Sequence, residues 1–259
     1  NSGHPGDSLG CTEFMTALFF DIMEHNPSDF TMEGKNSDMF FLSNGHITPV
    51  LYSVMARRGY FPVEELTTLR KIGARLQGHP DMKGTPGVEM STGSLGQGIC
   101  AANGMALAAK LDNKDYRVYA VLGDGELEEG QVWEAAMFAA HYNLDNLCAF
   151  VDFNGLQIDG DITKVMNPTP IDKKFEAFNW NVIIIDAHNI EEIKAALKKA
   201  KETKGKPTVI IANSVKGKGV SYMESNAAWH GAAPKEDEYN QAIKELDAKI
   251  AELEAKVNG

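Results

Sequence analysis

An aspartate and an asparagine follow two predicted strands, at a spacing that suits the binding of a metal ion. Residues 118–122 and 147–151 are apolar runs that predict buried strands, and the segment between them has the apolar spacing of a helix. A strand–helix–strand unit of this kind usually yields parallel strands. Asp124 and Asn154 then lie at the carboxyl ends of the two strands, where open α/β sheets bind ligands. A carboxylate, an amide oxygen and a nearby backbone carbonyl are hard oxygen ligands that suit Mg2+ or Ca2+.

The wider pattern around this pair resembles the motif of thiamine diphosphate (ThDP) enzymes. Asp124 lies in Gly-Asp-Gly, Asn154 follows thirty residues later, and a hydrophobic residue stands two positions further on. The stretches GDGELEEG and NGLQIDG resemble transketolases in particular. The resemblance implies that Asp124, Asn154 and the backbone carbonyl of Leu156 bind the metal. It also implies that Gly125 lies against the diphosphate and that Ile158 flanks the cofactor ring. Two plain turns that close ordinary strands are the alternative, which the whole constellation disfavours.

A glycine-rich segment, 87–98, also suits a diphosphate because it opens a predicted helix over 99–111. A helix N-terminus presents free backbone N–H groups and the positive end of the helix dipole. The transketolase resemblance implies that Gly93, Ser94 and Leu95 line the cofactor. Ser94 stands where many relatives carry proline, and we expect the change to be tolerated because backbone groups make the contacts. A glycine loop that only caps a packed helix is the alternative.

Four histidines lie in glycine-flanked loops, namely His4, His46, His79 and His230. Four such loops, in a chain with a metal–diphosphate motif, predict convergence on one polar pocket. The resemblance implies that His4, His79 and His230 contact the ketose or its reaction intermediate, and that His46 and His230 touch the cofactor. Imidazoles can hold sugar hydroxyls and move protons near neutral pH. The remaining histidines are interpreted as surface or core residues: His25, His141 and His188.

Four charged residues near these motifs receive separate interpretations. Lys216, fourteen residues before His230, matches a lysine that contacts the cofactor in some transketolases, and the alternative is a solvated loop lysine. Glu129 resembles a carboxylate that lies at the subunit interface near the cofactor. Glu126 and Glu128 are interpreted as solvated acids or as acids that favour a helix start.

The remaining segments predict an α/β fold, with a mostly parallel sheet and helices on both faces, as in the ThDP-binding fold. Further strands are expected over 38–42, 180–186 and 208–213, and further helices over 8–23, 49–57, 63–70 and 190–204. Residues 161–174 are expected to form a loop. We assign residues 1–234 to the diphosphate-binding domain and residues 235–259 to a C-terminal amphipathic helix.

The C-terminal helix carries an apolar stripe with steps of four and three residues, made by Tyr239, Ile243, Leu246, Ile250, Leu253 and Val257. A stripe of barely three heptads is too short to indicate a coiled coil by itself. We expect it to dock on its own domain, and a contact with another subunit is the alternative.

Charge and composition exclude several classes of protein. With 259 residues the chain is long enough for a large α/β domain, and its net charge of −11 argues against a general nucleic-acid binder. No apolar run is long enough to span a bilayer, and no signal peptide is visible. Three cysteines lie in apolar surroundings without a CxxC pair, which favours a reducing, cytoplasmic location. The chain begins inside a motif, so we expect further residues upstream.

The resemblance covers the diphosphate-binding half of a full-length transketolase and implies that a second half is needed. That second half holds the aminopyrimidine ring, and it supplies the glutamate that activates the cofactor. We therefore expect the N-terminal subunit of a two-chain transketolase, inactive without a C-terminal partner subunit, in a heterotetramer with two copies of each chain. The implied activity is transfer of a two-carbon ketol unit from a ketose phosphate such as xylulose 5-phosphate to an aldose phosphate such as ribose 5-phosphate. A truncated piece of a fused enzyme is the alternative.

Two other classes of function stay open at this point. One is a different ThDP enzyme on the same domain, such as dihydroxyacetone synthase or a sulfosugar transketolase. A 1-deoxyxylulose-5-phosphate synthase fits poorly, because the SGHPG, GHP and WHG loops are in the transketolase style. The other is a non-catalytic partner that binds ThDP without turnover. A nicotinamide-binding domain is disfavoured, because no GxGxxG follows the first strand.

Overall fold

Five strands build one parallel sheet in the computed structural model, which describes residues 2–31 and 37–258. Each neighbouring pair of strands runs parallel. In spatial order the strands are β1 (Met39–Leu42), β2 (Val118–Gly123), β3 (Leu147–Phe153), β7 (Thr208–Asn213) and β6 (Asn181–Asp186). A small antiparallel hairpin follows β3 and consists of β4 (Leu156–Gln157) and β5 (Gly160–Asp161). The prediction of a mostly parallel α/β fold is therefore confirmed.

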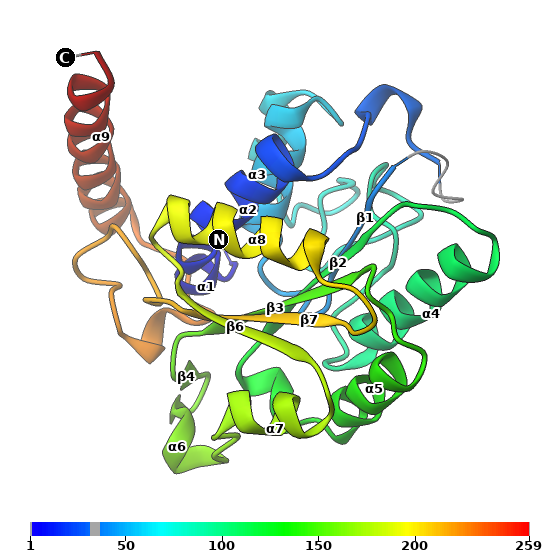
Figure 1. The fold of residues 1–259 in the computed structure, drawn as a ribbon. Helices are drawn as coiled ribbons and strands as arrows, with labels where there is room; N and C mark the ends of the chain where they lie inside the picture. The colour runs from blue at the N-terminus through cyan, green and yellow to red at the C-terminus, as the bar shows by residue number, and fades with distance from the viewer. Residues whose placement is uncertain (1, 32–36, 259) are drawn as a thin grey trace.

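Helices cover both faces of this sheet (Figure 1). One face packs against α2 (Thr12–Ala17), α3 (Thr48–Arg58) and α8 (Ile190–Glu202), and α1 (Pro5–Gly10) packs against α2 and α3. The opposite face packs against α4 (Gln97–Leu111), α5 (Gly130–His141) and α7 (Ile171–Ala177). Alternate strand residues supply the two cores, since Phe150 belongs to the first core and Ala149 and Val151 to the second. Burial on both faces explains why β1, β2, β3 and β7 are continuous apolar runs rather than alternating ones, whereas the edge strand β6 is only partly buried and leaves Ile184 exposed.

Three predicted segments differ from the observed elements. The helix expected over 8–23 is divided into α1, α2 and a π-helical turn, η1 (Leu18–Ile22). The break follows Gly10, where an added Cβ would lie 3.2 Å from the carbonyl oxygen of Val215, so the chain passes tightly against another segment. The helix expected over 63–70 is the 3-10 helix η3 (Val63–Thr68).

The loop expected over 161–174 is wrong, because this segment contains α6 (Ile162–Val165) and the start of α7. The Asp161 side chain accepts a hydrogen bond from the N–H of Thr163 and so caps α6. Ile162 and Ile171 are buried, which stabilises these short helices against the domain. Short 3-10 turns complete the fold: η2 (Pro27–Asp29), η4 (Gly125–Glu128) and η5 (Ala227–Trp229).

The C-terminal helix, α9 (Glu236–Asn258), extends away from the sheet (Figure 1). Ala242 is buried and Leu246 partly buried, and both pack against Val220 and Met223. The apolar side chains further along α9 are exposed, with Val257 at 85%. The expected docking of the whole stripe on its own domain is therefore wrong, because nothing in the described part of the chain covers its second half. Among the described residues, no helix has the length and apolar character that crossing a membrane requires.

Candidate active site

A cavity of about 200 Å3 lies at the carboxyl ends of β2 and β3. Parallel strands bring their carboxyl ends to one edge of the sheet, so residues distant in sequence meet there. The residues from the sequence analysis that line this cavity are His46, Leu95, Asp124, Gly125, Glu126, Glu128, Glu129, Asn154, Leu156, Ile158 and His230. The sequence-based grouping of the Gly-Asp-Gly turn, the Asn-Gly turn and two of the histidine loops therefore matches one place in the structure.

Asp124 links the ends of β2 and β3. One carboxylate oxygen accepts the N–H of Gly125 at 2.8 Å and the other accepts the N–H of Gly155 at 2.7 Å. Only 2% of Asp124 is exposed. Burial, followed by the nearby charge of Asp152, raises the pKa of Asp124 to about 7, although both backbone hydrogen bonds oppose that rise. The carboxylate is thus fixed in place and costly to ionise without a cation.

Asn154 is oriented by two carboxylates. Its amide nitrogen donates to Asp152 at 3.0 Å and to Asp7 at 3.2 Å. Because both partners only accept hydrogen bonds, the amide oxygen must point the other way, where it accepts the N–H of Leu156 at 3.0 Å. Asp124, Asn154 and Leu156 all line the cavity, and a carboxylate, an amide oxygen and a backbone carbonyl are hard oxygen donors of the kind that Mg2+ or Ca2+ prefers.

Three of the four loop histidines form one cluster. The ring centroids of His4 and His46 are 5.0 Å apart, those of His46 and His230 are also 5.0 Å apart, and those of His4 and His230 are 5.4 Å apart. Burial, followed by the neighbouring histidine, lowers the pKa of His4 to about 4. Burial also lowers the pKa of His46 to about 4, against the opposing effect of Asp7. Both rings are therefore neutral near pH 7 and can donate and accept hydrogen bonds.

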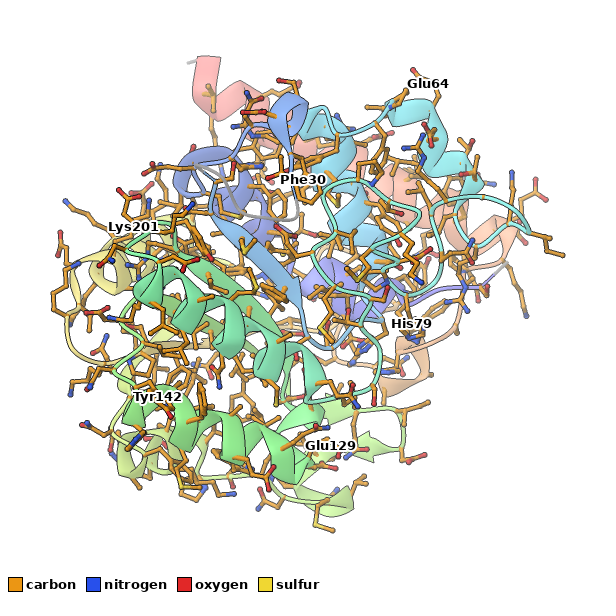
Figure 2. All side chains as sticks on the ribbon, turned by 90° about the vertical axis from the view of Figure 1, so that its right-hand side faces the viewer. Phe30, Glu64, His79, Glu129, Tyr142 and Lys201 are labelled. Carbon is orange, nitrogen blue, oxygen red and sulfur yellow. The ribbon has the colours of Figure 1, made fainter. Side chains whose placement is uncertain are left out.

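His79 lies against the glycine-rich segment rather than within this cluster. A Cβ added at Gly93 would lie 2.7 Å from Cδ2 of His79, so the two loops are in direct contact. Burial and the charge of Arg70 lower the pKa of His79. Figure 2 shows His79 and Glu129 on the same side of the molecule, with Glu129 at the start of α5.

The glycine-rich segment approaches the cavity through backbone contacts. Gly45 has a φ of 67°, and an added Cβ there would lie 2.5 Å from the backbone nitrogen of Gly93. The His46 loop therefore packs directly on this segment. Leu95 lines the cavity, and its carbonyl accepts a hydrogen bond from the side chain of Gln131 at 2.8 Å. Ser94 is exposed and does not line the cavity.

Glu126 is buried, so its interpretation as a solvated acid is wrong. Its carboxylate accepts the hydroxyl of Ser43 at 2.5 Å and the N–H groups of Gly96 at 2.7 Å and Gly123 at 3.2 Å. It joins the end of β1, the glycine-rich segment and the end of β2. Burial raises the pKa of Glu126 to about 7, against the effect of these hydrogen bonds. Glu128 is exposed, in agreement with the interpretation as a solvated acid.

Lys216 is completely buried, so the alternative of a solvated loop lysine is wrong. Its ammonium group contacts the carboxylate of Asp7 and lies 3.1 Å from Nδ1 of His230. Asp7 also lies 3.1 Å from Nδ1 of His230. Burial favours the neutral form of Asp7, but its contacts with His230 and Lys216 outweigh burial and hold its pKa well below the usual range. Lys216 thus contacts the histidine cluster directly at His230 and also through the carboxylate of Asp7.

Three buried acids belong to this site although the sequence did not predict them as part of it, namely Asp7, Glu126 and Asp152. Asp152 lies in β3 two residues before Asn154, which follows the strand, and the alternation of side chains would have placed the two on the same side of the sheet. Asp7 lies one helical turn after His4, which is a weak signal by itself. Glu126 lies in an acidic run whose other members are exposed, so the sequence held no sign of its burial.

Comparisons with known proteins agree with this geometry. The family model described as transketolase, thiamine diphosphate binding domain, matches residues 1–253. The chain is 46% identical to the 6-deoxy-6-sulfo-D-fructose transketolase subunit SqwG of Clostridium sp. (strain MSTE9), covering 96% of this chain and 90% of that one. It is 41% identical to an apulose-4-phosphate transketolase subunit of Phocaeicola vulgatus, covering 100% of this chain and 91% of that one.

Longer relatives match over only part of their length. Mouse transketolase is 43% identical over 96% of this chain, but the match covers 39% of the mouse protein. A crystal structure of transketolase from Pichia stipitis superposes with a TM-score of 0.88 at 37% identity, covering 93% of this chain and 37% of that one. This chain therefore matches nearly the full extent of the subunit-type relatives and the smaller part of the single-chain ones.

Proposed function

Because the chain belongs to the transketolase family through its thiamine diphosphate binding domain, we propose that it is the N-terminal subunit of a two-chain transketolase. The observation that carries this proposal is the cavity at the ends of β2 and β3, where the oxygen ligands and the histidine cluster meet. The match to about nine-tenths of two relatives that are named as transketolase subunits supports the two-chain arrangement.

In this proposal the chain holds the metal and the diphosphate of ThDP. Asp124, Asn154 and the carbonyl of Leu156 bind Mg2+ or Ca2+, and Gly125 and Leu95 lie against the diphosphate. Bound ThDP supplies an electron sink for the two-carbon unit that is transferred. The buried negative charge of Asp124 and Asp152 supports the assignment, because a divalent cation offsets the cost of ionising them together.

The histidines bind the sugar and handle its protons. His4, His79 and His230 surround the hydroxyl groups of the ketose, while His46 and His230 border the cofactor. His4 and His46 are neutral near pH 7, because the pKa of each is about 4, so each offers one donor and one acceptor nitrogen. Neutral rings can hold hydroxyls without the added cost of a buried charge.

A separate C-terminal chain completes the site with the pyrimidine-binding half, in a heterotetramer with two copies of each chain. The exposed cavity edge with Glu129 supports this arrangement, because a carboxylate at the rim is free to meet another chain. The three cysteines form no disulfide, which supports a cytoplasmic location.

The donor in this proposal is a ketose that bears an anionic group. Two classes of substrate are distinguishable. Xylulose 5-phosphate and ribose 5-phosphate are the donor and acceptor of a general transketolase. The names of two relatives instead favour a sulfosugar or apulose 4-phosphate as the substrate. These relatives support the second class, and their identity of 41–46% leaves the choice to experiment.

The test mixes this chain with its candidate C-terminal partner, ThDP and Mg2+, and measures two-carbon transfer from each donor to an aldose phosphate. We expect transfer only when both chains are present, and the donor with the highest kcat/KM identifies the substrate class. The chain without its partner is the control for inactivity. ThDP binding without transfer from any of the donors would contradict the proposal and favour a non-catalytic partner.

A further inference from the structure

Asp7 lies next to the histidine cluster, where its carboxylate contacts the ring of His230. It lies in α1, is 4% exposed, and its two carboxylate oxygens have different neighbours. One oxygen, Oδ1, accepts hydrogen bonds from Lys216 and from the amide nitrogen of Asn154. The other, Oδ2, lies 3.1 Å from Nδ1 of His230 and 3.8 Å from Nε2 of His46. Oδ1 therefore binds Lys216 and Asn154, whereas Oδ2 faces the histidine rings.

Oδ2 is buried and has no aligned hydrogen-bond partner among the described residues, and the nitrogens near it belong to His230 and His46. In His46, Nδ1 lies 3.0 Å from the backbone carbonyl of Asn44, which only accepts, so Nδ1 carries the proton of that neutral ring. The Nε2 of His46 then has no proton, and at 3.8 Å from Asp7 it makes no hydrogen bond. At 3.1 Å, the Nδ1 of His230 is thus the nearest nitrogen among the described residues that can supply Oδ2 with a proton.

Lys216 also contacts Nδ1 of His230, but it favours the opposite protonation of that nitrogen. Its ammonium group lies 3.1 Å from Nδ1 of His230, and an ammonium can only donate, so it would require a bare Nδ1. Asp7 requires a protonated Nδ1. The two neighbours therefore favour different tautomers of His230, and the carboxylate decides the outcome because it also binds the competing ammonium group through Oδ1.

We propose that Asp7 is a positioning residue that fixes His230 with its proton on Nδ1 and leaves Nε2 as a proton acceptor at the cavity. The inference rests on the proposed function for its catalytic meaning, since a bare Nε2 can take a proton from a sugar hydroxyl. The other charged and titratable groups that face this ring are Lys216, His4 and His46. The ring of His4 packs edge to face on that of His230, and the ring of His46 packs on it at a tilt. Among the described residues, neither ring makes a hydrogen bond with Nδ1 of His230.

The substitution Asp7→Asn tests this directly, because the site dictates how the new amide is oriented. Lys216 and Asn154 both donate to the position of Oδ1, so the amide oxygen must occupy it. The amide NH2 group then faces Nδ1 of His230 and donates to it. The proton of the ring moves to Nε2, as happens when the aspartate of a serine-protease triad is replaced by asparagine.

The first measurement is long-range 1H–15N NMR of the uniformly 15N-labelled full chain, without ThDP or partner, at a pH where the ring is neutral. The His230 signals are assigned by their loss in His230→Gln. We expect the Nδ1–H tautomer in the wild type and in Lys216→Met, and the Nε2–H tautomer in Asp7→Asn. A purely structural role for Asp7 would not distinguish these two variants. An Nε2–H wild type, or an unchanged tautomer in Asp7→Asn, would overturn the proposal.

Glu13→Gln is the matched control. Glu13 lies 3.2 Å from Nδ1 of His188, which is the same carboxylate–imidazole pairing outside the cavity. This variant should alter the signals of His188 and leave those of His230 unchanged. If Asp7→Asn alone does not fold, the double variant Asp7→Asn/Lys216→Met removes the unpaired buried ammonium group. Asn154 still orients the amide, so the same Nε2–H tautomer is expected.

The second measurement uses the complex with the partner chain and ThDP. We expect Asp7→Asn to lower kcat about 100-fold, within the range seen when a residue that orients a reactive imidazole is replaced, with a KM for the donor that changes by less than about 3-fold. Glu13→Gln should leave both constants unchanged. An inactive wild-type complex would refute the proposed function and leave the NMR result standing. A switched tautomer with unchanged kcat would overturn the role of Nε2.

Discussion

Replacing Asp124 with asparagine should make the metal-free chain more stable while it removes the metal site. The carboxylate is buried, and burial together with Asp152 raises its pKa from 3.8 to about 7. The folded chain therefore binds a proton more tightly than the unfolded chain between these values. The sign follows from linkage: the free energy of unfolding falls as pH rises through this window, and the full penalty is present above pH 7.

The magnitude follows from the same pKa difference. A rise of about 3 in pKa, at 1.4 kcal/mol for each unit, corresponds to about 4 kcal/mol of lost stability near pH 8. An asparagine at this position would escape that penalty but would turn its NH2 group toward one of the two backbone N–H donors, Gly125 or Gly155. The loss of a hydrogen bond to a charged acceptor costs about 2 kcal/mol. We therefore expect Asp124→Asn to be about 2 kcal/mol more stable than the wild type at pH 8.

The advantage should depend on pH. At pH 5 Asp124 is protonated in the folded wild type, so only part of the cost of ionising it is present. The stability advantage of Asp124→Asn therefore falls by about 3 kcal/mol and vanishes or reverses. Urea unfolding in EDTA, followed by circular dichroism at both pH values, measures it. Asp172→Asn, an equivalent replacement in the first turn of α7, is the surface control. Equal differences at pH 5 and pH 8 would refute the electrostatic reasoning.

The same variant should lose the response to cofactor. Ligands that bind the folded state raise its apparent stability according to their affinity. ThDP and Mg2+ should therefore raise the Tm of the wild type and leave that of Asp124→Asn unchanged. A variant that still responds to ThDP and Mg2+ with the wild-type midpoint would show that Asp124 is not a metal ligand.

Three further outcomes can be measured on the chain alone. Glu126→Ala leaves three donors without an acceptor and should lower the free energy of urea unfolding by about 3–5 kcal/mol, whereas Glu128→Ala, at an exposed position, should change it by less than about 0.5 kcal/mol. Leu253→Ala on the exposed part of α9 should also change the free energy of unfolding by less than about 0.5 kcal/mol, whereas Leu197→Ala in the core should lower it by about 2–5 kcal/mol. A large loss of stability in Leu253→Ala would show that this part of α9 docks on the domain. Cys100 should react with a thiol reagent in the folded chain while the two buried cysteines stay protected until unfolding, and equal rates for all three would contradict the burial described.

Apolar periodicity predicted the sheet because the signal is local. The run 118–122 and the run 147–151 appear as β2 and β3, paired in parallel, and their ends carry Asp124 and Asn154 as expected. Turn chemistry was similarly readable, since the glycine-flanked loops that carry His46 and His230 do meet at the cavity. Strand ends and glycine turns determine position through the backbone of a few adjacent residues, so a sequence reveals them.

The errors arose where distant segments determine the outcome. The spacing of the α9 stripe is indistinguishable from that of a docked helix, and only the path of the chain after Trp229 places its second half in solvent. Glu126 and Glu128 are near neighbours of the same type, yet Ser43 and Gly96 select one of them as a buried acceptor. No periodicity distinguishes the two, because the donors come from segments that are distant in sequence.

Under the proposed function, the charges of the site favour the joint binding of a metal and a diphosphate. The carboxylates of Asp7, Asp124 and Asp152 are buried around one edge of the sheet, with Lys216 as their buried cation. Lys216 is engaged by Asp7, and although its charge lowers the pKa of Asp124 and Asp152, burial outweighs that effect at both. A diphosphate alone would bring further negative charge to Asp124 and Asp152, and the glycine-rich segment could oppose that only with backbone dipoles. A divalent cation held by Asp124 and Asn154 would reverse the sign of the local field. If the proposed function holds, the buried acids therefore make the cation a condition of cofactor binding.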